Sequence, residues 1–400
     1  MKYVVVLGDG MADEPIAEIG GKTPLMQAKT PVMDELAGKS LIGLAATIPE
    51  GMNPGSDTAN LAVLGYNPKQ YYTGRSSLEA LSIGVPMKDT DIALRCNIVT
   101  LSEEDVPYGE RTIIDHSSGE ISTADAAVLL EAVRKELADD IYSYYAGTSY
   151  RHLLIWDKGR VVPLTPPHDI LGKKIGEYLP GEDKLREMME KSYDILNNHP
   201  LNLARAEKGL HKANSIWFWG AGTRPALDNF KEKTGKRGVM ISAVDLLKGI
   251  AIGAGMKVIE VPGADGTLHT NYTGKAQAAV DALLKDGYDF AYIHVEAPDE
   301  MGHQGNLANK IEAIESLDSK VVRTVVEGMR AAGEPYRLLI MPDHPTPIRC
   351  RTHTSGPVPF LLYDSTREQK RIGFYNEAEA EDSGIFYPEG YRLIDTLLEK

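Results

Sequence analysis

Three side chains in the last quarter of the sequence could bind a metal ion. An apolar run at residues 339–341 is followed closely by Asp343 and His344, and His353 comes nine residues later. Such a run is typical of a buried strand, and open α/β sheets place ligand sites at the carboxyl ends of their strands. A carboxylate and two imidazoles favour a transition metal. Three ligands do not complete a site, so we expect others from elsewhere in the chain.

A second pair of an acid and a histidine follows another apolar run, at residues 292–295. Asp299 and His303 are four residues apart, and in a helix this spacing places both side chains on one face, where they can hold one ion. Near the amino terminus, the β-branched run 3–7 stops at a Gly-Asp-Gly turn. This pattern places Asp9 at the end of a further strand.

Ser56 is the candidate nucleophile. It follows Gly55 at the expected start of a helix, where we predict that it is the N-cap residue. Free backbone N–H groups at a helix start favour anions. Thr58, Ser76 and Ser77 are rival hydroxyls, but only Ser56 combines a preceding glycine with the cap position.

These positions form one set of potential ligands at the ends of expected strands. Oxygen and nitrogen ligands in this number fit two divalent ions, and the imidazoles favour Mn²⁺ or Zn²⁺ over Ca²⁺, with Mg²⁺ as a third candidate. Two such ions beside a serine predict phosphoryl transfer through a transient phosphoserine. The predicted set is Asp9, Ser56, Asp299, His303, Asp343, His344 and His353.

The elements that must position these residues indicate an α/β fold. Strands and helices alternate from residue 238 to residue 295, and a long helix is expected at 307–332. This alternation predicts parallel crossovers and a sheet with helices on both faces. We expect the main sheet to resume at Ser215 after an insertion.

The predicted domains follow from that insertion. Residues 1–90 and 211–400 would form the metal-binding catalytic domain, and residues 91–210 a smaller α/β domain inserted into it.

The composition excludes several classes of protein. The 400 residues carry a formal net charge of -14, whereas a nucleic-acid-binding protein would need a basic patch. Cys96 and Cys350 are too few for a disulfide framework. The sequence shows no signal-peptide pattern and no apolar run long enough for a membrane span, so we expect a cytoplasmic protein without a membrane partner. Nothing in the sequence indicates an oligomeric state.

Several motifs together resemble a known family. They resemble the metal and nucleophile motifs of the alkaline phosphatase superfamily and, more narrowly, the archaeal-type cofactor-independent phosphoglycerate mutases. Further segments, such as residues 72–80, 114–123 and 241–249, extend the resemblance over nearly the whole chain. The motifs are Gly8-Asp9-Gly10-Met11, residues 55–60, Pro298-Asp299 through Gly302-His303, Pro342-Asp343-His344 and Thr352-His353-Thr354.

The resemblance implies an alkaline-phosphatase-like, mostly parallel sheet sandwiched by helices, interrupted by a smaller α/β cap domain. It implies an enzyme of glycolysis that interconverts 3-phosphoglycerate and 2-phosphoglycerate through a phosphoserine at Ser56. It also assigns the ligands to two ions. Asp9, Ser56, Asp343 and His344 would hold one ion, and Asp299, His303 and His353 the other.

Two alternatives remain beside the mutase. A related subgroup implies a homoserine kinase of threonine biosynthesis, and the second alternative is a non-catalytic metal-binding relative. Both enzyme hypotheses, the mutase and the kinase, require a small phosphorylated substrate. Because guanidinium and ammonium groups bind phosphate and carboxylate, the candidate substrate-binding residues are Arg75, Arg95, Arg151 and Lys236.

Overall fold

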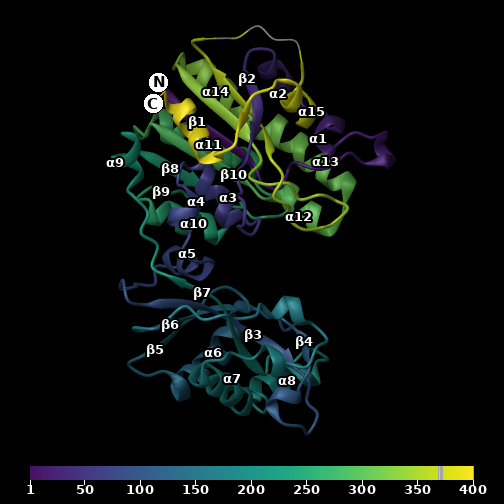
Figure 1. Cartoon of the computed structure of the whole chain (residues 1–400), viewed down its shortest axis with the longest axis vertical. Helices are drawn as coiled ribbons and strands as arrows, with labels where there is room; N and C mark the ends of the chain where they lie inside the picture. The colour runs from purple at the N-terminus through teal and green to yellow at the C-terminus, as the bar shows by residue number, and fades with distance from the viewer. Residues whose placement is uncertain (368, 370–372, 400) are drawn as a thin grey trace. The chain divides into compact units, whose positions relative to one another are not determined.

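The chain forms two compact units in a computed structural model that describes residues 1–367, 369 and 373–399 (Figure 1). The first unit comprises Met1–Tyr72 and Ala226–Lys400, and the second comprises Thr73–Pro225. The insertion expected at residues 91–210 is therefore longer at both ends. It includes helix α5 (Arg75–Ser82) and strand β7 (Ser215–Thr223).

An eight-stranded sheet forms the centre of the first unit. Most neighbouring strands run parallel, and only β12 runs antiparallel to both of its neighbours. This sheet confirms the predicted mostly parallel α/β fold. The strand order is β13 (Phe386–Tyr387), β2 (Leu41–Ala45), β12 (Val358–Asp364), β11 (Tyr336–Met341), β1 (Lys2–Gly8), β10 (Phe290–Val295), β8 (Gly238–Ile241) and β9 (Lys257–Val258).

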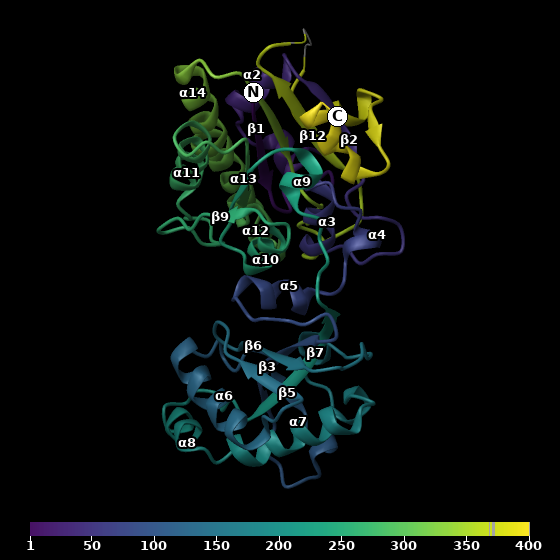
Figure 2. The ribbon, with the colours of Figure 1, turned by 90° about the vertical axis from the view of Figure 1, so that its left-hand side faces the viewer.

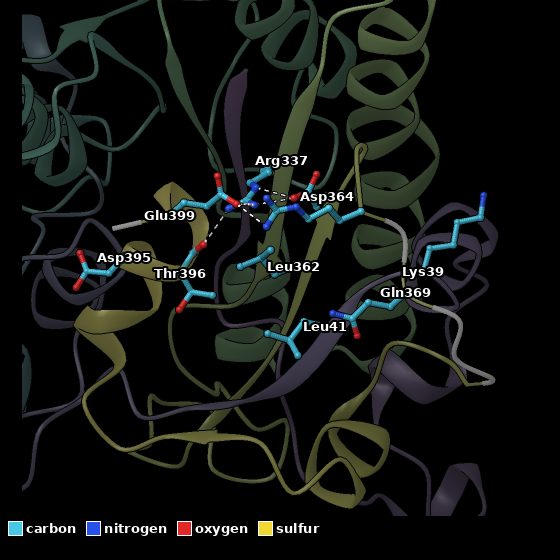
Figure 3. Close-up of a pocket in the computed structure, with 10 residues that line it drawn as sticks. Lys39, Leu41, Arg337, Leu362, Asp364, Gln369, Asp395, Thr396 and Glu399 are labelled. Atoms are coloured by element: carbon cyan, nitrogen blue, oxygen red, sulfur yellow. Dashed lines mark hydrogen bonds and ion pairs between the residues drawn. The ribbon is translucent and has the colours of Figure 1, made fainter.

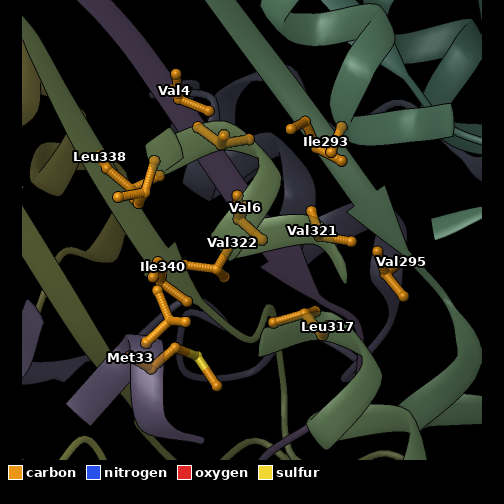
Figure 4. Close-up of a cluster of buried hydrophobic side chains, with 14 of the residues drawn as sticks. Val4, Val6, Met33, Ile293, Val295, Leu317, Val321, Val322, Leu338 and Ile340 are labelled. Atoms are coloured by element: carbon orange, nitrogen blue, oxygen red, sulfur yellow. The ribbon is translucent and has the colours of Figure 1, made fainter. Parts of the chain in front are cut away.

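The central strands are buried on both faces, which explains their continuous apolar sequences. On one face, alternate side chains of β1, β10 and β11 pack against helical residues that include Val321 and Met33 (Figure 4). On the other face, Tyr292 of β10 contacts Asn60 of helix α3. The helices of this unit include α1 (Pro24–Gln27), α2 (Pro31–Ala37), α3 (Ser56–Val63), α4 (Pro68–Tyr71), α9 (Phe230–Thr234), α10 (Asp245–Gly253), α11 (Tyr272–Leu284), α12 (Ala297–Gln304), α15 (Glu377–Asp382) and α16 (Leu393–Leu398).

The long helix expected at residues 307–332 is not a uniform α-helix. It consists of α13 (Leu307–Ser316), the π-helical segment Leu317–Val322 and α14 (Arg323–Ala332). The π-helical segment carries the buried Asp318, whose carboxylate accepts hydrogen bonds from the first backbone N–H groups of α2. Apolar periodicity predicted the helix but could not show this local widening.

The second unit has its own sheet (Figure 2), which has five strands, and its own hydrophobic core. Its long strand β3 pairs antiparallel with β4, β6 and β7. Apolar side chains of two helices complete the core. The elements are β3 (Ile92–Leu101), β4 (Ile113–Asp115), β5 (Tyr142–Tyr145), β6 (Arg151–Trp156), β7, α5, α6 (Thr123–Leu137), α7 (Asp183–Leu196) and α8 (Pro200–Glu207).

The expectation that the main sheet resumes at Ser215 is wrong. Strand β7 pairs with β3 of the smaller sheet, with Cys96 opposite Phe218. The apolar run of β7 could not show which sheet buries it, because either core would accept the same side chains. Among the described residues, no helix is long and apolar enough to cross a membrane.

Candidate functional site

Three neighbouring strands bring the predicted ligands to one edge of the large sheet. Strand β1 lies between β10 and β11 and runs parallel to both. Asp9 therefore follows β1 at the same edge where Asp343 and His344 follow β11. Helix α12, which begins two residues after β10, carries Asp299 and His303 on one turn. This is the edge at which open α/β sheets bind their ligands.

Asp9, Asp343 and His344 form one compact ligand group, with ligand atoms within 4.8 Å of one another. His344 Nε2 lies 3.5 Å from Asp9 Oδ1 and 3.4 Å from Asp343 Oδ2. All three side chains are buried. Burial, together with the charge of Asp343, raises the pKa of Asp9 well above its usual value. Two buried carboxylates repel each other, so both can be ionised only beside a positively charged partner.

Asp299, His344 and His353 form a second group of the same size. His303 joins it, because its Nε2 lies 3.2 Å from Asp299 Oδ2 and 3.0 Å from His353 Nε2. Burial opposes ionisation of Asp299, but hydrogen bonds to His303 and His353 bring the pKa of its carboxyl well below the usual value. The hydrogen bond to Asp299 raises the pKa of His303 to about 9. His344 thus touches both groups.

Ser56 lies beside these groups, with its Oγ 3.1 Å from His344 Nε2. It is the first residue of α3 and not its N-cap. The cap is Gly55, whose extended backbone leads into the helix without a side-chain cap. The glycine that marked Ser56 in the sequence thus occupies the position that was expected for the serine. Ser56 still stands in the first turn, where backbone N–H groups favour anions.

The sequence did not identify the residues that hold the ligands in place. Thr346 donates its hydroxyl hydrogen to Asp299 Oδ1. Asn60 donates to Asp343 Oδ2 at 2.8 Å, and His294 Nε2 lies 2.8 Å from Asp9 Oδ2. The sequence did contain one signal for these supporting residues. Tyr292 and His294 alternate within the apolar strand β10, and polar side chains in a buried strand need hydrogen-bond partners.

Three of the four predicted substrate-binding residues lie in the second unit. Arg95 is buried, and both it and Arg75 bind Glu79, at 2.7 Å and 2.9 Å. Burial, with added repulsion from Arg75 and Arg151, lowers the pKa of Arg95 to about 10. The three arginines therefore form one cationic cluster. His168 contributes a ring to the same neighbourhood, 5.3 Å from that of Trp219, over which Arg95 stacks.

The fourth, Lys236, is wrongly placed for the predicted role. It precedes β8, and its Nζ lies 5.0 Å from the ring centroid of Tyr3, at the start of β1. Both positions are at the amino ends of parallel strands, opposite the edge that carries the ligand groups. Because Lys236 precedes its strand in the sequence, the preference of ligand sites for the carboxyl ends of strands already argued against it.

A polar pocket around Arg337 is separate from this site (Figure 3). Arg337 stands near the amino end of β11, whereas the ligand residues follow its carboxyl end. Its guanidinium binds Asp364, Glu399 and two carbonyl groups of α16. These contacts show that the buried Arg337 attaches the C-terminal helix α16 to the sheet.

The side chains of the two groups fit divalent cations. Each group offers oxygen and nitrogen ligands, the combination that manganese and zinc accept. Asp9 Oδ1 is buried and, within the described part of the chain, has no hydrogen-bond partner. A cation would satisfy that oxygen and relieve the repulsion between Asp9 and Asp343.

Comparisons with known proteins identify relatives that cover the whole chain. Residues 37–202 match the family model described as 2,3-bisphosphoglycerate-independent phosphoglycerate mutase. A probable enzyme of that name from Geobacter sulfurreducens is 48% identical over 100% of both chains, and one from Methanosarcina barkeri is 48% identical over 96% of both. A solved Pyrococcus horikoshii protein is 28% identical and covers 100% of this chain and 96% of its own, with a TM-score of 0.82. The chain therefore belongs to the 2,3-bisphosphoglycerate-independent phosphoglycerate mutase family.

Proposed function

We propose that the protein is a 2,3-bisphosphoglycerate-independent phosphoglycerate mutase that uses Ser56 as its nucleophile. The observation that carries this proposal is the position of Ser56, whose Oγ lies 3.1 Å from Nε2 of His344, a member of both ligand groups, in a chain 48% identical to a probable enzyme of that name. The enzyme would interconvert 3-phosphoglycerate and 2-phosphoglycerate, and we expect it to act in the cytoplasm.

The ligand groups divide between two divalent cations in this proposal. Asp9, Asp343, His344 and Ser56 would hold one, and Asp299, His303 and His353 the other. Mn²⁺ and Zn²⁺ suit the mixture of carboxylate and imidazole, and Mg²⁺ is the third candidate. When bound, the cations neutralise charge on the phosphoryl oxygens and lower the pKa of a nearby hydroxyl.

Ser56 would accept and return the phosphoryl group. Its Oγ forms a bond to phosphorus while the bond from phosphorus to the substrate oxygen breaks, and the reverse transfer places the group on the neighbouring oxygen of the same glycerate. The first turn of α3 favours the anionic group through its backbone N–H dipoles. Because the phosphoryl group returns to glycerate, the reaction consumes no nucleotide.

The cationic cluster of the second unit would bind the anionic groups of the substrate. Arg95 is 4% exposed, and its Nε has no hydrogen-bond partner within the described residues. A buried N–H without a partner is costly, and a carboxylate or phosphate oxygen would satisfy it. On this reading the second unit is the substrate-binding domain of the enzyme.

Two assays test the function. Purified protein with Mn²⁺ should convert 3-phosphoglycerate to 2-phosphoglycerate without any nucleotide, and it should not phosphorylate homoserine from ATP. Ser56→Ala should abolish conversion while keeping the metal content of the parent. If the protein phosphorylates homoserine but does not convert 3-phosphoglycerate, it is a kinase and not a mutase. If it acts on neither substrate, it is a non-catalytic relative.

A further inference from the structure

A fully buried histidine, His294, contacts the candidate metal ligand Asp9. His294 belongs to β10 and is 0% exposed. Its Nε2 lies 2.8 Å from Asp9 Oδ2, and its Nδ1 lies 3.1 Å from the hydroxyl of Ser242, which follows β8. His294 is not among the candidate metal ligands. It therefore bridges the ends of two strands by way of Asp9 and Ser242.

The neighbours of His294 fix the direction of these hydrogen bonds. The backbone N–H of Val244 donates to Ser242 Oγ at 3.0 Å, so the hydroxyl hydrogen can point toward His294 Nδ1. An ionised Asp9, as a metal ligand must be, can only accept a hydrogen from Nε2. Together the two contacts select the neutral imidazole that carries its hydrogen on Nε2.

A buried lysine holds the backbone of the same residue. Lys275 of α11 is 0% exposed, and its Nζ donates to the carbonyl oxygen of His294 at 3.2 Å. The ring of His294 and its main chain are thus both held by hydrogen bonds. Such a residue has little freedom to turn away from Asp9.

We infer that His294 is a positioning residue that decides which oxygen of Asp9 faces the cation. Its Nε2–H occupies Oδ2, so Oδ1, the oxygen that has no hydrogen-bond partner in the described part of the chain, is left for the ion. This inference rests on the metal site of the proposed function. Residues that orient a metal ligand in this way change metal affinity by about 10–100-fold when they are replaced.

A metal titration tests this role independently of catalysis. Free Mn²⁺ is measured by electron paramagnetic resonance as the ion is added to metal-free parent, His294→Leu and His294→Gln. The amide nitrogen of glutamine can replace the Nε2–H donor, whereas leucine cannot. Ile293→Val, on the same strand but facing the apolar core, serves as a control for lost packing.

His294→Leu should weaken one class of Mn²⁺ site about 10–100-fold, while His294→Gln and Ile293→Val should stay within about threefold of the parent. Parent-like binding by His294→Leu would overturn the inference, and so would a glutamine variant as weak as the leucine variant. A parent that binds Mn²⁺ but lacks mutase activity would refute the proposed function and leave this role of His294 standing.

Discussion

Asn60 donates a hydrogen bond to Asp343, with Nδ2 and Oδ2 2.8 Å apart. The same nitrogen lies 2.8 Å from the carbonyl oxygen of Ser56, and the hydroxyl of Tyr292 donates to Asn60 Oδ1 at 2.5 Å. Both amide hydrogens and the amide oxygen are thus engaged. Asn60 couples the first turn of α3, which carries the proposed nucleophile Ser56, to a carboxylate of the candidate ligand group.

Asn60→Asp should lower kcat by about 100-fold or more, because it replaces a donor with a second negative charge facing Asp343, at a site where misplacement of about 1 Å can cost that much. Tyr292→Phe should lower it less, since it only removes the hydroxyl that orients the amide. Steady-state kinetics with saturating Mn²⁺ would measure both. Equal effects of the two changes would contradict the coupling.

Removal of metal should destabilise the first unit as well as abolish turnover. Without cations, Asp9 and Asp343 face each other in a buried cluster, and burial raises the pKa of Asp9. Ligand that binds only the folded state stabilises it by about 2.7 kcal/mol at 100 times its Kd. Chelator should therefore lower the thermal midpoint, and added Mn²⁺ should restore it. Asp343→Asn with His344→Ala removes two ligands of one of the two proposed cations, so its shift on chelation should be smaller than that of the parent.

The sequence pointed to the candidate ligands more directly than to the residues that hold them in place. The ligands stand at strand ends, where an apolar run stops at Asp9 or Asp343, and chain order alone reveals such positions. The supports depend on contacts between distant segments. Lys310, for example, donates to the carbonyl oxygen of Thr346 at 2.8 Å and so holds the turn that follows His344.

The same distinction applies to the fold. Element types followed from periodicity, but the sheet to which β7 belongs depended on pairing with β3, which is more than a hundred residues earlier in the chain. Periodicity carries no information about partners. The limits of the second unit could not be predicted for that reason.

Breaking the buried ion pair between Lys310 and Asp13 should cost about 3–5 kcal/mol. The two groups are 2.8 Å apart, with side chains 0% and 1% exposed. Lys310→Met leaves the Asp13 carboxylate buried without its cation, and Asp13→Asn in the same chain should recover part of the loss. Urea unfolding of the two single variants and the double variant measures this. Strict additivity would show that the groups do not interact.

Arg95→Lys should raise KM for 3-phosphoglycerate about 10-fold or more with a smaller change in kcat, because an ammonium cannot reproduce a bidentate guanidinium. Arg134→Lys is the matched control, since Arg134 lies in the same unit, has a side chain that is 54% exposed, and pairs with Glu131 of its own helix. Thermal midpoints of both variants separate binding from folding. An unchanged KM in Arg95→Lys would remove this residue from the substrate site.

Acid should destabilise the second unit through His152. This histidine is 1% exposed, its Nδ1 accepts a hydrogen bond from the backbone N–H of Gly147, and burial lowers its pKa to about 4. Protonation of Nδ1 would make the N–H of the ring face the backbone N–H of Gly147, so that two hydrogen-bond donors would point at each other. Between pH 6.5 and 4 the unfolded chain binds a proton that the folded chain does not, so stability falls as pH falls, by up to about 3 kcal/mol.

His152→Asn should remove this dependence on pH, because its amide oxygen can still accept from Gly147 but does not titrate. Unfolding of parent and variant is compared from pH 7 to pH 4 with chelator present throughout, so that loss of metal does not contribute. The parent should lose more stability than the variant over this range. Parallel curves would show that His152 takes up its proton at the same pH in the folded and the unfolded chain, which contradicts the prediction.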